Sequence, residues 1–264
     1  MATAFTDDLG RRVVLAAPPQ RIISLCPSQT ETLFALGAGA RVVGRTRWCI
    51  HPQPEVERVA AVGGTKKINI GRAAELRPDL FLCEKEENTP ELVAQAEALA
   101  PVYVTDVRDI ASALHMIRSV GALVSAASAT DSLASGIEMA FAGLPRAAWP
   151  QRVLYLIWRE PWMCVGSDTY IGSLLDHLGL VNAGAELPGR YPILTPGEFE
   201  RLAPDRVLLS SEPYAFTPAH LAEVNALAPG AEAQCVDGEA FSWYGARMLP
   251  AADYLRSLVA GWTH

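Results

Sequence analysis

The 264-residue sequence lacks most of the signals that quickly assign a chain to a class of protein. It has no run of 18 or more uncharged apolar residues, so no segment is predicted to cross a bilayer as a helix. Lys and Arg number 22 against 29 Asp and Glu, and the net charge of −7 comes with no basic run. This balance argues against nucleic acids and anionic membrane surfaces as main partners. Hydrophobic residues make up 50% of the chain and charged residues 19%, which is typical of a globular protein.

Enzyme motifs and targeting signals are also missing. The sequence contains no G-x-S-x-G elbow, P-loop, H-E-x-x-H or C-x-x-C motif. The segment 1–12 has two acids and no apolar core, unlike a secretory leader, so we expect a cytoplasmic protein. The open alternative is a periplasmic protein whose leader has been removed. The cysteines are odd in number and scattered, which favours reduced thiols over a disulfide framework: Cys26, Cys49, Cys83, Cys164 and Cys235.

Short apolar runs alternate with helical segments along the chain, which predicts an α/β fold with mostly parallel strands. The clearest strand candidates are Arg21–Cys26, Leu80–Cys83 and Arg152–Trp158. Residues 71–82 resemble residues 197–208 at an offset of 126, and each copy reads as a short helix, a Pro-Asp turn and a strand. The sequence therefore predicts two similar Rossmann-like lobes.

The segment from Asp109 to Leu144 contains no proline and carries apolar residues at helical spacing. A continuous helix of this length would extend about 50 Å, long enough to connect two lobes. We therefore predict an N-terminal lobe (1–108), one connecting backbone helix (109–145) and a C-terminal lobe (146–264). Two ordinary helices, broken near residues 125–130, are the alternative.

Aromatic residues gather in the loops that follow predicted strands. Trp48 follows the second strand, and aromatic loops also occur at 158–162, 212–216 and 241–247. Tryptophan offers a large rigid face with one donor, which suits a bulky planar ligand with polar edges. Packing between the lobes is the simpler explanation, but charged side chains in these same loops would be costly in a dry interface. We favour a ligand site.

Charged residues near these loops add further candidates. The acidic run 84–88 is of the kind that usually forms a solvated loop, yet it lies between a strand and a helix, where a ligand site would open. Lys66 and Lys67 could neutralise these acids or a ligand carboxylate. The predicted ligand-binding residues are Trp48, Lys66, Glu86, Asn88, Trp158, Arg159, Trp162, Glu212, Tyr214, Trp243, Tyr244 and Arg247.

Cys49 and His51 form the only tight thiol–imidazole pair in the sequence. On alternate positions of an extended segment both side chains would face one way, as two soft metal ligands could. A structural turn before Pro52 explains the pair as well, because no third or fourth ligand is evident. A metal-dependent enzyme or metallochaperone that uses this pair, with Cys26, is a third functional hypothesis.

Several segments together resemble a known family. They are the R-I-I-S-L-x-P-S-x-T-E segment at 21–31, the R-P-D and A-P-D turns, the long mid-chain helix and the G-S-D-T-Y segment at 166–170. This combination resembles the cluster A (class III) substrate-binding proteins, the helical-backbone metal receptors of cobalamin and ferric-siderophore uptake, and most of all their cobalamin-binding branch. The resemblance implies capture of a metal chelate in a cleft between two rigid lobes, followed by delivery to an ABC permease, without catalysis.

The sequence departs from that family at positions that bear on its partners. The resemblance implies one acidic residue on each lobe that pairs with permease arginines, but Gly71 and Gly197 occupy these positions. Glu198 is adjacent to the second, but it belongs to a predicted capping box with Thr195. The tryptophan that covers the ligand in the cobalamin binder aligns with Lys66. Permease docking and cobalamin as the ligand are therefore both doubtful.

The sequence thus leads to a ranked set of hypotheses. The first is a non-enzymatic cytoplasmic carrier or sensor that binds a bulky metal chelate or tetrapyrrole-like ligand, of the cobalamin, heme or ferric-siderophore type, with no intrinsic cofactor. The second is the periplasmic component of an ABC importer. The metal-dependent enzyme or metallochaperone is the third.

Overall fold

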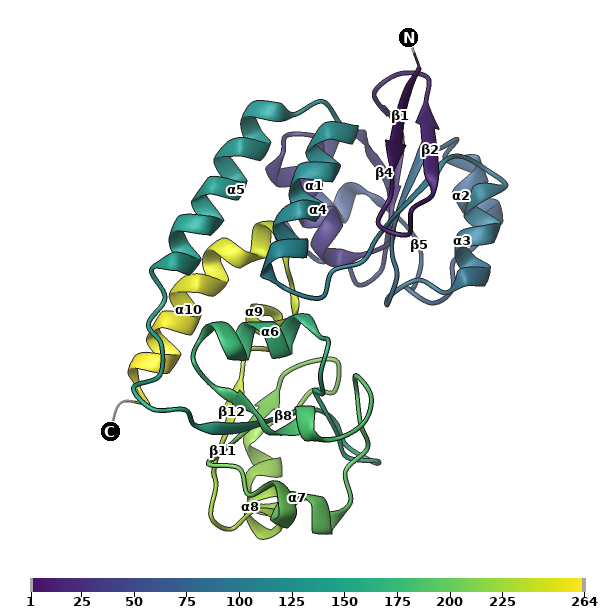
Figure 1. Ribbon diagram of the computed structural model, residues 1–264. Coiled ribbons are helices and arrows are strands. Elements are labelled where there is room, and N and C mark those ends of the chain that lie inside the picture. The colour runs from purple at the N-terminus through teal and green to yellow at the C-terminus, as the bar shows by residue number, and fades with distance from the viewer. Residues whose placement is uncertain (1, 263–264) are drawn as a thin grey trace. The chain divides into compact units, whose positions relative to one another are not determined.

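The chain forms two compact α/β units in the computed structural model, which describes residues 2–262 (Figure 1). The first unit takes the chain up to Val107 together with Ala111–Glu138 and Tyr244–Arg247. The second takes Arg108–Ile110, Met139–Trp243 and the chain from Met248 onward. The predicted α/β class with two lobes and parallel sheets is confirmed, while the predicted domain boundaries stay a prediction.

The first unit is built on a five-stranded sheet with the order β5-β4-β3-β6-β7, and all its neighbouring strands run parallel. Its strands are β3 (Ile22–Ser24), β4 (Val42–Thr46), β5 (Ala60–Gly63), β6 (Leu80–Glu84) and β7 (Val102–Thr105). An antiparallel hairpin of β1 (Thr3–Thr6) and β2 (Arg12–Leu15) precedes the sheet. The helices α1 (Pro27–Ala35), α2 (Ile70–Glu75) and α3 (Pro90–Glu97) connect the strands. Every residue of β6 is buried, as expected for a central strand covered on both faces.

The second unit contains a parallel sheet with the order β10-β8-β11-β12, and β9 pairs antiparallel with β8. Its strands are β8 (Arg152–Trp158), β9 (Met163–Cys164), β10 (Val181–Asn182), β11 (Arg206–Ser210) and β12 (Glu232–Val236). Its helices are α6 (Tyr170–His177), α7 (Pro196–Leu202), α8 (Leu221–Leu227), α9 (Gly238–Ser242) and α10 (Met248–Ala260). Short 3-10 helices occur in both units: Gly39–Arg41, Glu55–Arg58 and Gly245–Arg247 in the first, and Ala183–Glu186 and Pro218–His220 in the second.

The repeat seen in the sequence is a repeat in the structure. The bounds of β11 are those of β6 shifted by 126 residues, and α7 likewise corresponds to α2. In the first unit the Asp79 carboxylate accepts hydrogen bonds from the backbone N–H groups of Gln20 (2.8 Å) and Arg21 (2.9 Å). The Arg21 guanidinium donates to the carbonyl oxygen of Leu76, at the end of α2 (2.9 and 2.7 Å).

The second unit has the same arrangement. The backbone N–H of Arg152 donates to the Asp205 carboxylate (2.6 Å), and the Arg152 guanidinium donates to the carbonyl oxygen of Leu202, at the end of α7 (3.1 and 2.7 Å). We call each arrangement an Arg–Asp clamp. In both units the clamp joins the amino ends of two neighbouring strands to the helix that precedes the second of them. Its charge-assisted bonds satisfy backbone groups that the ends of the helix and the strands leave without partners.

The prediction of one long helix in the middle of the chain is wrong. The structure has two helices, α4 (Ile110–Leu123) and α5 (Ala127–Ala142), as the alternative in the sequence analysis had it. Ser125 adopts a left-handed backbone conformation (φ 56°), and the N–H of Ala126 bonds back to the Gly121 carbonyl (2.9 Å). This is the hydrogen-bonding pattern with which helices end. Among residues 2–262 no helix is both long and apolar enough to span a membrane.

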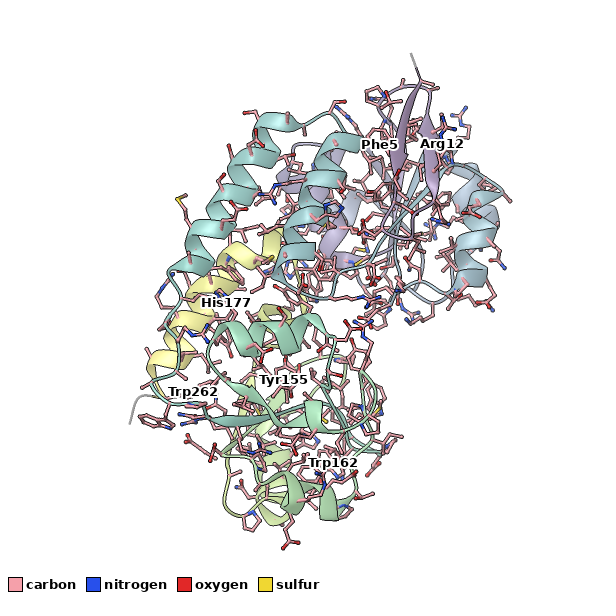
Figure 2. The ribbon with its side chains drawn as sticks, in the orientation of Figure 1. Phe5, Arg12, Tyr155, Trp162, His177 and Trp262 are labelled. Carbon is pink, nitrogen blue, oxygen red and sulfur yellow. The ribbon has the colours of Figure 1, made fainter. Side chains whose placement is uncertain are left out.

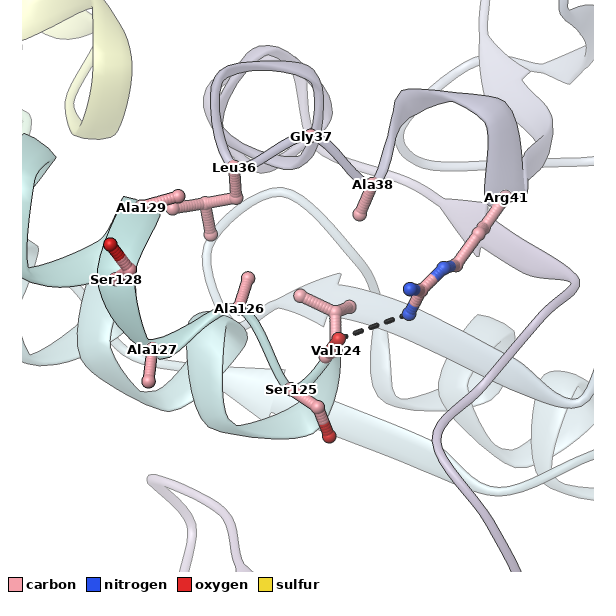
Figure 3. Close-up of a pocket in the computed structure, with 10 residues that line it drawn as sticks. All are labelled: Leu36, Gly37, Ala38, Arg41, Val124, Ser125, Ala126, Ala127, Ser128 and Ala129. Carbon is pink, nitrogen blue, oxygen red and sulfur yellow. Dashed lines mark hydrogen bonds between the residues drawn. The ribbon is translucent and has the colours of Figure 1, made fainter.

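A small pocket lies at this helix break (Figure 3). Its volume is about 320 Å³, and it is lined by the end of α1, the turn between α4 and α5, and Arg41. The Arg41 guanidinium donates to the carbonyl oxygen of Val124 (3.0 Å), so it satisfies one of the carbonyls that the end of α4 leaves exposed.

Candidate ligand-binding site

The predicted site residues follow the carboxyl ends of parallel strands. In the first unit, the loops after β4, β5 and β6 carry Trp48, Lys66 and the segment 86–88. In the second unit, Trp158 ends β8, and the loops after β8 and β11 carry the segments 159–162 and 212–216. Open α/β sheets place ligands at this edge, so each unit presents a candidate binding surface there.

Trp48 is the most exposed aromatic residue of the first unit, with 54% of its surface accessible. The guanidinium carbon of Arg47 lies 4.9 Å from the centre of the indole ring, within the range of a cation–π interaction. The exposed Lys66 donates from Nζ to the carbonyl oxygen of Glu86, and this bond ties the loop after β5 to the loop after β6.

Asn88 is buried, and its side chain connects the loop after β6 to the loop after β5 and to Leu25. Its side-chain nitrogen donates to the carbonyl oxygens of Leu25 (3.2 Å) and Thr65 (2.8 Å), and its oxygen accepts from the backbone N–H of Glu84 (2.8 Å). Only 3% of Asn88 is exposed, so we interpret it as a positioning residue beneath the surface that carries Lys66 and Glu86.

Glu84 is a functional candidate that the sequence analysis missed. Its carboxylate is almost fully buried at the end of β6, and Oε2 accepts from the backbone N–H groups of Glu86 (2.7 Å) and Glu87 (2.9 Å). Burial raises the pKa of Glu84 to about 7, because the desolvation of the charged form outweighs these two hydrogen bonds. In the sequence it looked like one more member of a solvated acidic run, and only burial distinguishes it.

Tyr244 and Arg247 come from the end of the chain but belong to the first unit. Arg247 forms an ion pair with Glu31 on α1 (2.8 Å), and the buried Tyr244 hydroxyl lies 3.5 Å from the Cys26 sulfur. Gly245 between them has a φ of 73°, and a Cβ there would lie 2.1 Å from the Thr32 hydroxyl oxygen. The segment therefore packs tightly onto α1.

The possible metal ligands of the sequence analysis have hydroxyl neighbours. Cys49 is fully buried, and its sulfur accepts from the Thr30 hydroxyl (3.1 Å) and contacts the Thr46 hydroxyl (3.2 Å). Burial raises the pKa of the Cys49 thiol. His51 is half-buried in the same loop. Within residues 2–262, no three His, Cys, Asp or Glu side chains gather as they would around a metal ion.

The aromatic loops of the second unit pack against one another. Trp162, labelled in Figure 2, stacks on Phe216 with the two rings 4° from parallel and 5.9 Å between centroids. Tyr214 packs against Phe216 (4.7 Å) and against the edge of Trp158 (5.7 Å). Trp158 is 40% exposed, so it is the ring of this cluster with the most free surface.

Arg159 lies beside this cluster with its charge balanced locally. Its guanidinium forms ion pairs with Glu160 (2.8 Å) and Glu223 (2.9 Å). It also lies 5.9 Å from the centre of the Trp162 ring. The hydrogen bond from Arg159 to Glu223 raises the pKa of the guanidinium further, so Arg159 is a permanently charged group with two acidic partners.

Glu212 and Trp243 are joined by a hydrogen bond. The Glu212 carboxylate accepts from the Trp243 indole N–H (2.8 Å) and from the Ser242 hydroxyl (2.5 Å). Burial raises the pKa of Glu212. Trp243 itself is only 7% exposed, so its polar edge is engaged inside the second unit.

Two apolar residues that the sequence analysis did not single out extend the surface around Trp158. Met163 pairs with Trp158 across β8 and β9, and Ile193 forms a β-bridge with Met163 on its other side. Ile193 is 57% exposed. The sequence gives no signal for Ile193, because the segment between Pro192 and Pro196 is too short to show a periodic pattern.

A polar cavity of about 590 Å³ lies elsewhere in the second unit, around the start of α6. Its lining includes Arg108, Asp168, Thr169 and Asn182. The Arg108 guanidinium forms an ion pair with Asp168 (3.0 Å), and Thr169 caps α6 by accepting from the N–H of Gly172 (3.1 Å).

The predicted capping box at the start of α7 is confirmed. The Glu198 carboxylate accepts from the backbone N–H (2.5 Å) and the hydroxyl (3.0 Å) of Thr195. These bonds lower the pKa of Glu198 and occupy its carboxylate locally. Gly71 and Gly197 are exposed on α2 and α7 and supply no charge.

The comparison with known protein families decides the relationship. The family described as periplasmic binding protein matches residues 22–228. The chain belongs to this family. Among curated relatives, the vitamin B12-binding protein of Pectobacterium carotovorum is 26% identical over 203 residues, which are 75% of this chain and 73% of the relative. The substrate-binding lipoprotein YvrC of Bacillus subtilis, named as part of an ABC transporter, is 25% identical over 76% of this chain and 67% of its own length.

Solved structures show the same fold. The periplasmic heme-binding protein BhuT in complex with two hemes has a TM-score of 0.78 and 26% identity, covering 92% of this chain and 99% of BhuT. The periplasmic vitamin B12-binding protein of Vibrio cholerae has a TM-score of 0.74 at 18% identity over 92% of this chain and 97% of its own.

These findings overturn the expected cytoplasmic location. The family is one of periplasmic binding proteins, and one curated relative is a lipoprotein of an ABC transporter, which points to an extracytoplasmic location. The expectation was wrong because it depended on the first twelve residues and on the number of cysteines, and neither reports on the fold.

Proposed function

We propose that this chain is the extracytoplasmic substrate-binding component of an ABC importer and that it binds a bulky metal chelate or tetrapyrrole-like ligand without catalysing a reaction. The observation that carries the proposal is the exposure of Trp48 and Trp158, each beside charged groups at the carboxyl edge of a parallel sheet. The names of two relatives support the ligand class, since one is a vitamin B12-binding protein and the other a protein in complex with two hemes.

The candidate residues divide into two roles in this proposal. On the binding surface of the first unit Trp48 provides an exposed ring face, and Lys66 and Glu86 provide polar groups. On that of the second unit Trp158 provides the ring face and Arg159 the polar group. The buried or internally bonded members position these groups and the loops that carry them: Asn88, Trp162, Glu212, Tyr214, Trp243, Tyr244 and Arg247. Delivery to a permease is part of the proposal, but Gly71 and Gly197 provide no carboxylates for it, so we expect permease contacts to use other residues.

A thermal-shift titration tests the proposal. The purified chain is heated with cyanocobalamin, hemin or a ferric hydroxamate siderophore, each well above its dissociation constant. At 100 times that constant, a ligand adds about 2.7 kcal/mol to the free energy of unfolding, and Tm rises by a few degrees. A rise with at least one chelate is expected. No rise with any of the three would refute the proposed ligand class.

A pair of matched variants locates the site. Trp158→Ala should abolish most of the shift, whereas Trp149→Ala should leave it intact, because Trp149 is 51% exposed but lies in the linker before β8. Equal shifts in the two variants would exclude Trp158 from the site without contradicting the function.

A further inference from the structure

Trp48 and three cationic residues lie on the loops after β4 and β5 of the first unit. Arg47, Lys66 and Lys67 are all exposed, and Arg47 lies over the indole ring. Gly64 lies where these two loops meet, and its N–H donates to the carbonyl oxygen of Lys67 (2.8 Å). A Cβ on Gly64 would lie 3.6 Å from the Trp48 indole nitrogen and 3.8 Å from an Arg47 guanidinium nitrogen. We call Arg47, Trp48, Lys66 and Lys67 the Trp48 cluster.

The cations of this cluster differ from Arg159 and Lys85 in their ion pairs. Arg47 and Lys67 take part in no ion pair with any residue from 2 to 262. By contrast, Arg159 beside Trp158 has two acidic partners, and Lys85 on the neighbouring loop is paired with Asp106 (2.7 Å).

The buried Glu84 carboxylate does not reach this surface either. The Glu84 carboxylate is turned inward to the backbone N–H groups of Glu86 and Glu87, and it is 2% exposed. The group that Lys66 meets on the same loop is the carbonyl oxygen of Glu86. An exposed aromatic face bordered by Arg and Lys is suited to a flat ligand whose edge carries carboxylates, because ring stacking and charge-assisted hydrogen bonds then form together.

We propose that the Trp48 cluster selects a planar chelate with peripheral carboxylates, such as a dicarboxylate porphyrin, over a corrinoid whose ring side chains are neutral amides. This inference rests on the proposed function and narrows its ligand class. Trp48 contacts the ring, and Arg47 and Lys67 contact the carboxylates.

A matched ligand pair tests the selection directly. Fe(III) deuteroporphyrin IX, which has two free carboxylates, and its dimethyl ester are titrated into the protein by Soret absorbance, with cyanocobalamin as the corrinoid. The wild-type protein should bind the diacid at least about tenfold more tightly than the diester, since hydrogen bonds to charged groups are the stronger ones. Raising the salt from about 50 mM to about 300 mM should weaken diacid binding and leave diester binding almost unchanged.

Variants connect the effect to the cluster. The double variant Arg47→Gln/Lys67→Gln should lose the preference for the diacid while binding the diester within about twofold of wild type. Arg256→Gln is the control for net charge, because it removes a cation from α10 in the second unit, where Arg256 pairs with Asp253, and it should keep the preference.

The results of these titrations distinguish a failure of this inference from a failure of the proposed function. Equal affinity for diacid and diester in the wild type, or a preference that survives in the double variant, would overturn the role of the Trp48 cluster. Tight binding of cyanocobalamin without binding of either porphyrin would overturn the inference but leave the binding function standing. Failure of all three ligands would count against the proposed function itself.

Discussion

Glu84 makes a prediction about pH that can be worked through quantitatively. Its folded-state pKa of about 7 is higher than the ordinary value of 4.5 because its carboxylate is buried. The folded state therefore holds a proton that the unfolded chain has already released between these two pH values. The contribution of Glu84 to stability is complete below about pH 4.5 and is lost as the pH rises through about 7.

The difference between the two pKa values sets the size of the effect. One pKa unit corresponds to about 1.4 kcal/mol, so ionised Glu84 lowers the free energy of unfolding by about 3 kcal/mol above pH 7. Glu84→Gln mimics the protonated form at every pH. We expect the variant to be within about 1 kcal/mol of the wild type at pH 5 and to be more stable at pH 8 by up to about 3 kcal/mol.

Denaturant unfolding at a series of pH values measures this difference, because subtracting the two curves removes the titration of all other groups. Glu200→Gln serves as the control for the loss of one carboxylate, since it removes an exposed one from α7. A constant or negative difference between Glu84→Gln and the wild type from pH 5 to pH 8 would refute the reasoning.

Other predictions follow from individual contacts. Gly121→Ala should lower the free energy of unfolding by about 2 kcal/mol, because the new Cβ would lie 1.8 Å from the Thr130 hydroxyl oxygen, and Thr130→Ala should restore part of that loss in thermal unfolding. Asn88→Ala removes three buried hydrogen bonds and should cost about 3 kcal/mol in denaturant unfolding, whereas a cost below about 1 kcal/mol would contradict its positioning role. Trp48→Ala should change stability by less than about 0.5 kcal/mol, because the ring is more than half exposed, but should abolish the ligand-induced rise in Tm. Asp205→Ala should cost about 1 kcal/mol through the bond lost from the Arg152 N–H, and unchanged unfolding would show that this clamp is dispensable.

The sequence predicted the framework well, because strands and their connections depend on local patterns. The apolar runs at 80–83 and 152–158 became the buried strands β6 and β8, and the repeated Pro-Asp turns became matching clamps. The break between α4 and α5 was harder to predict. Ser125 adopts a left-handed conformation without being Gly or Asn, and Gly121 is needed for contact with a residue of the next helix, which periodicity cannot reveal.

The positions of the candidate residues along the fold were predictable, but their burial was not. The sequence placed the aromatic and charged residues after strands, where the structure has them, and that they bind a ligand stays a prediction. Which side chains face solvent depends on neighbours far away in the sequence. Asn88 is buried because it bonds to Leu25 and Thr65, and Trp162 is partly covered because Phe216 stacks on it. The same reason separates Glu84 from the other acids of its run.

The Arg–Asp clamps have a consequence for how the ligand preference of such a protein can change in evolution. They fasten the amino ends of the strands, while Trp48 and Lys66 lie on loops at the opposite ends and Trp158 is the last residue of β8. Substitutions in these loops leave the fastened ends untouched, so recognition can be altered while the framework persists. The loops after β4 and β5 should therefore be interchangeable parts: grafted from a relative with another ligand preference, they should transfer that preference to a scaffold that still folds.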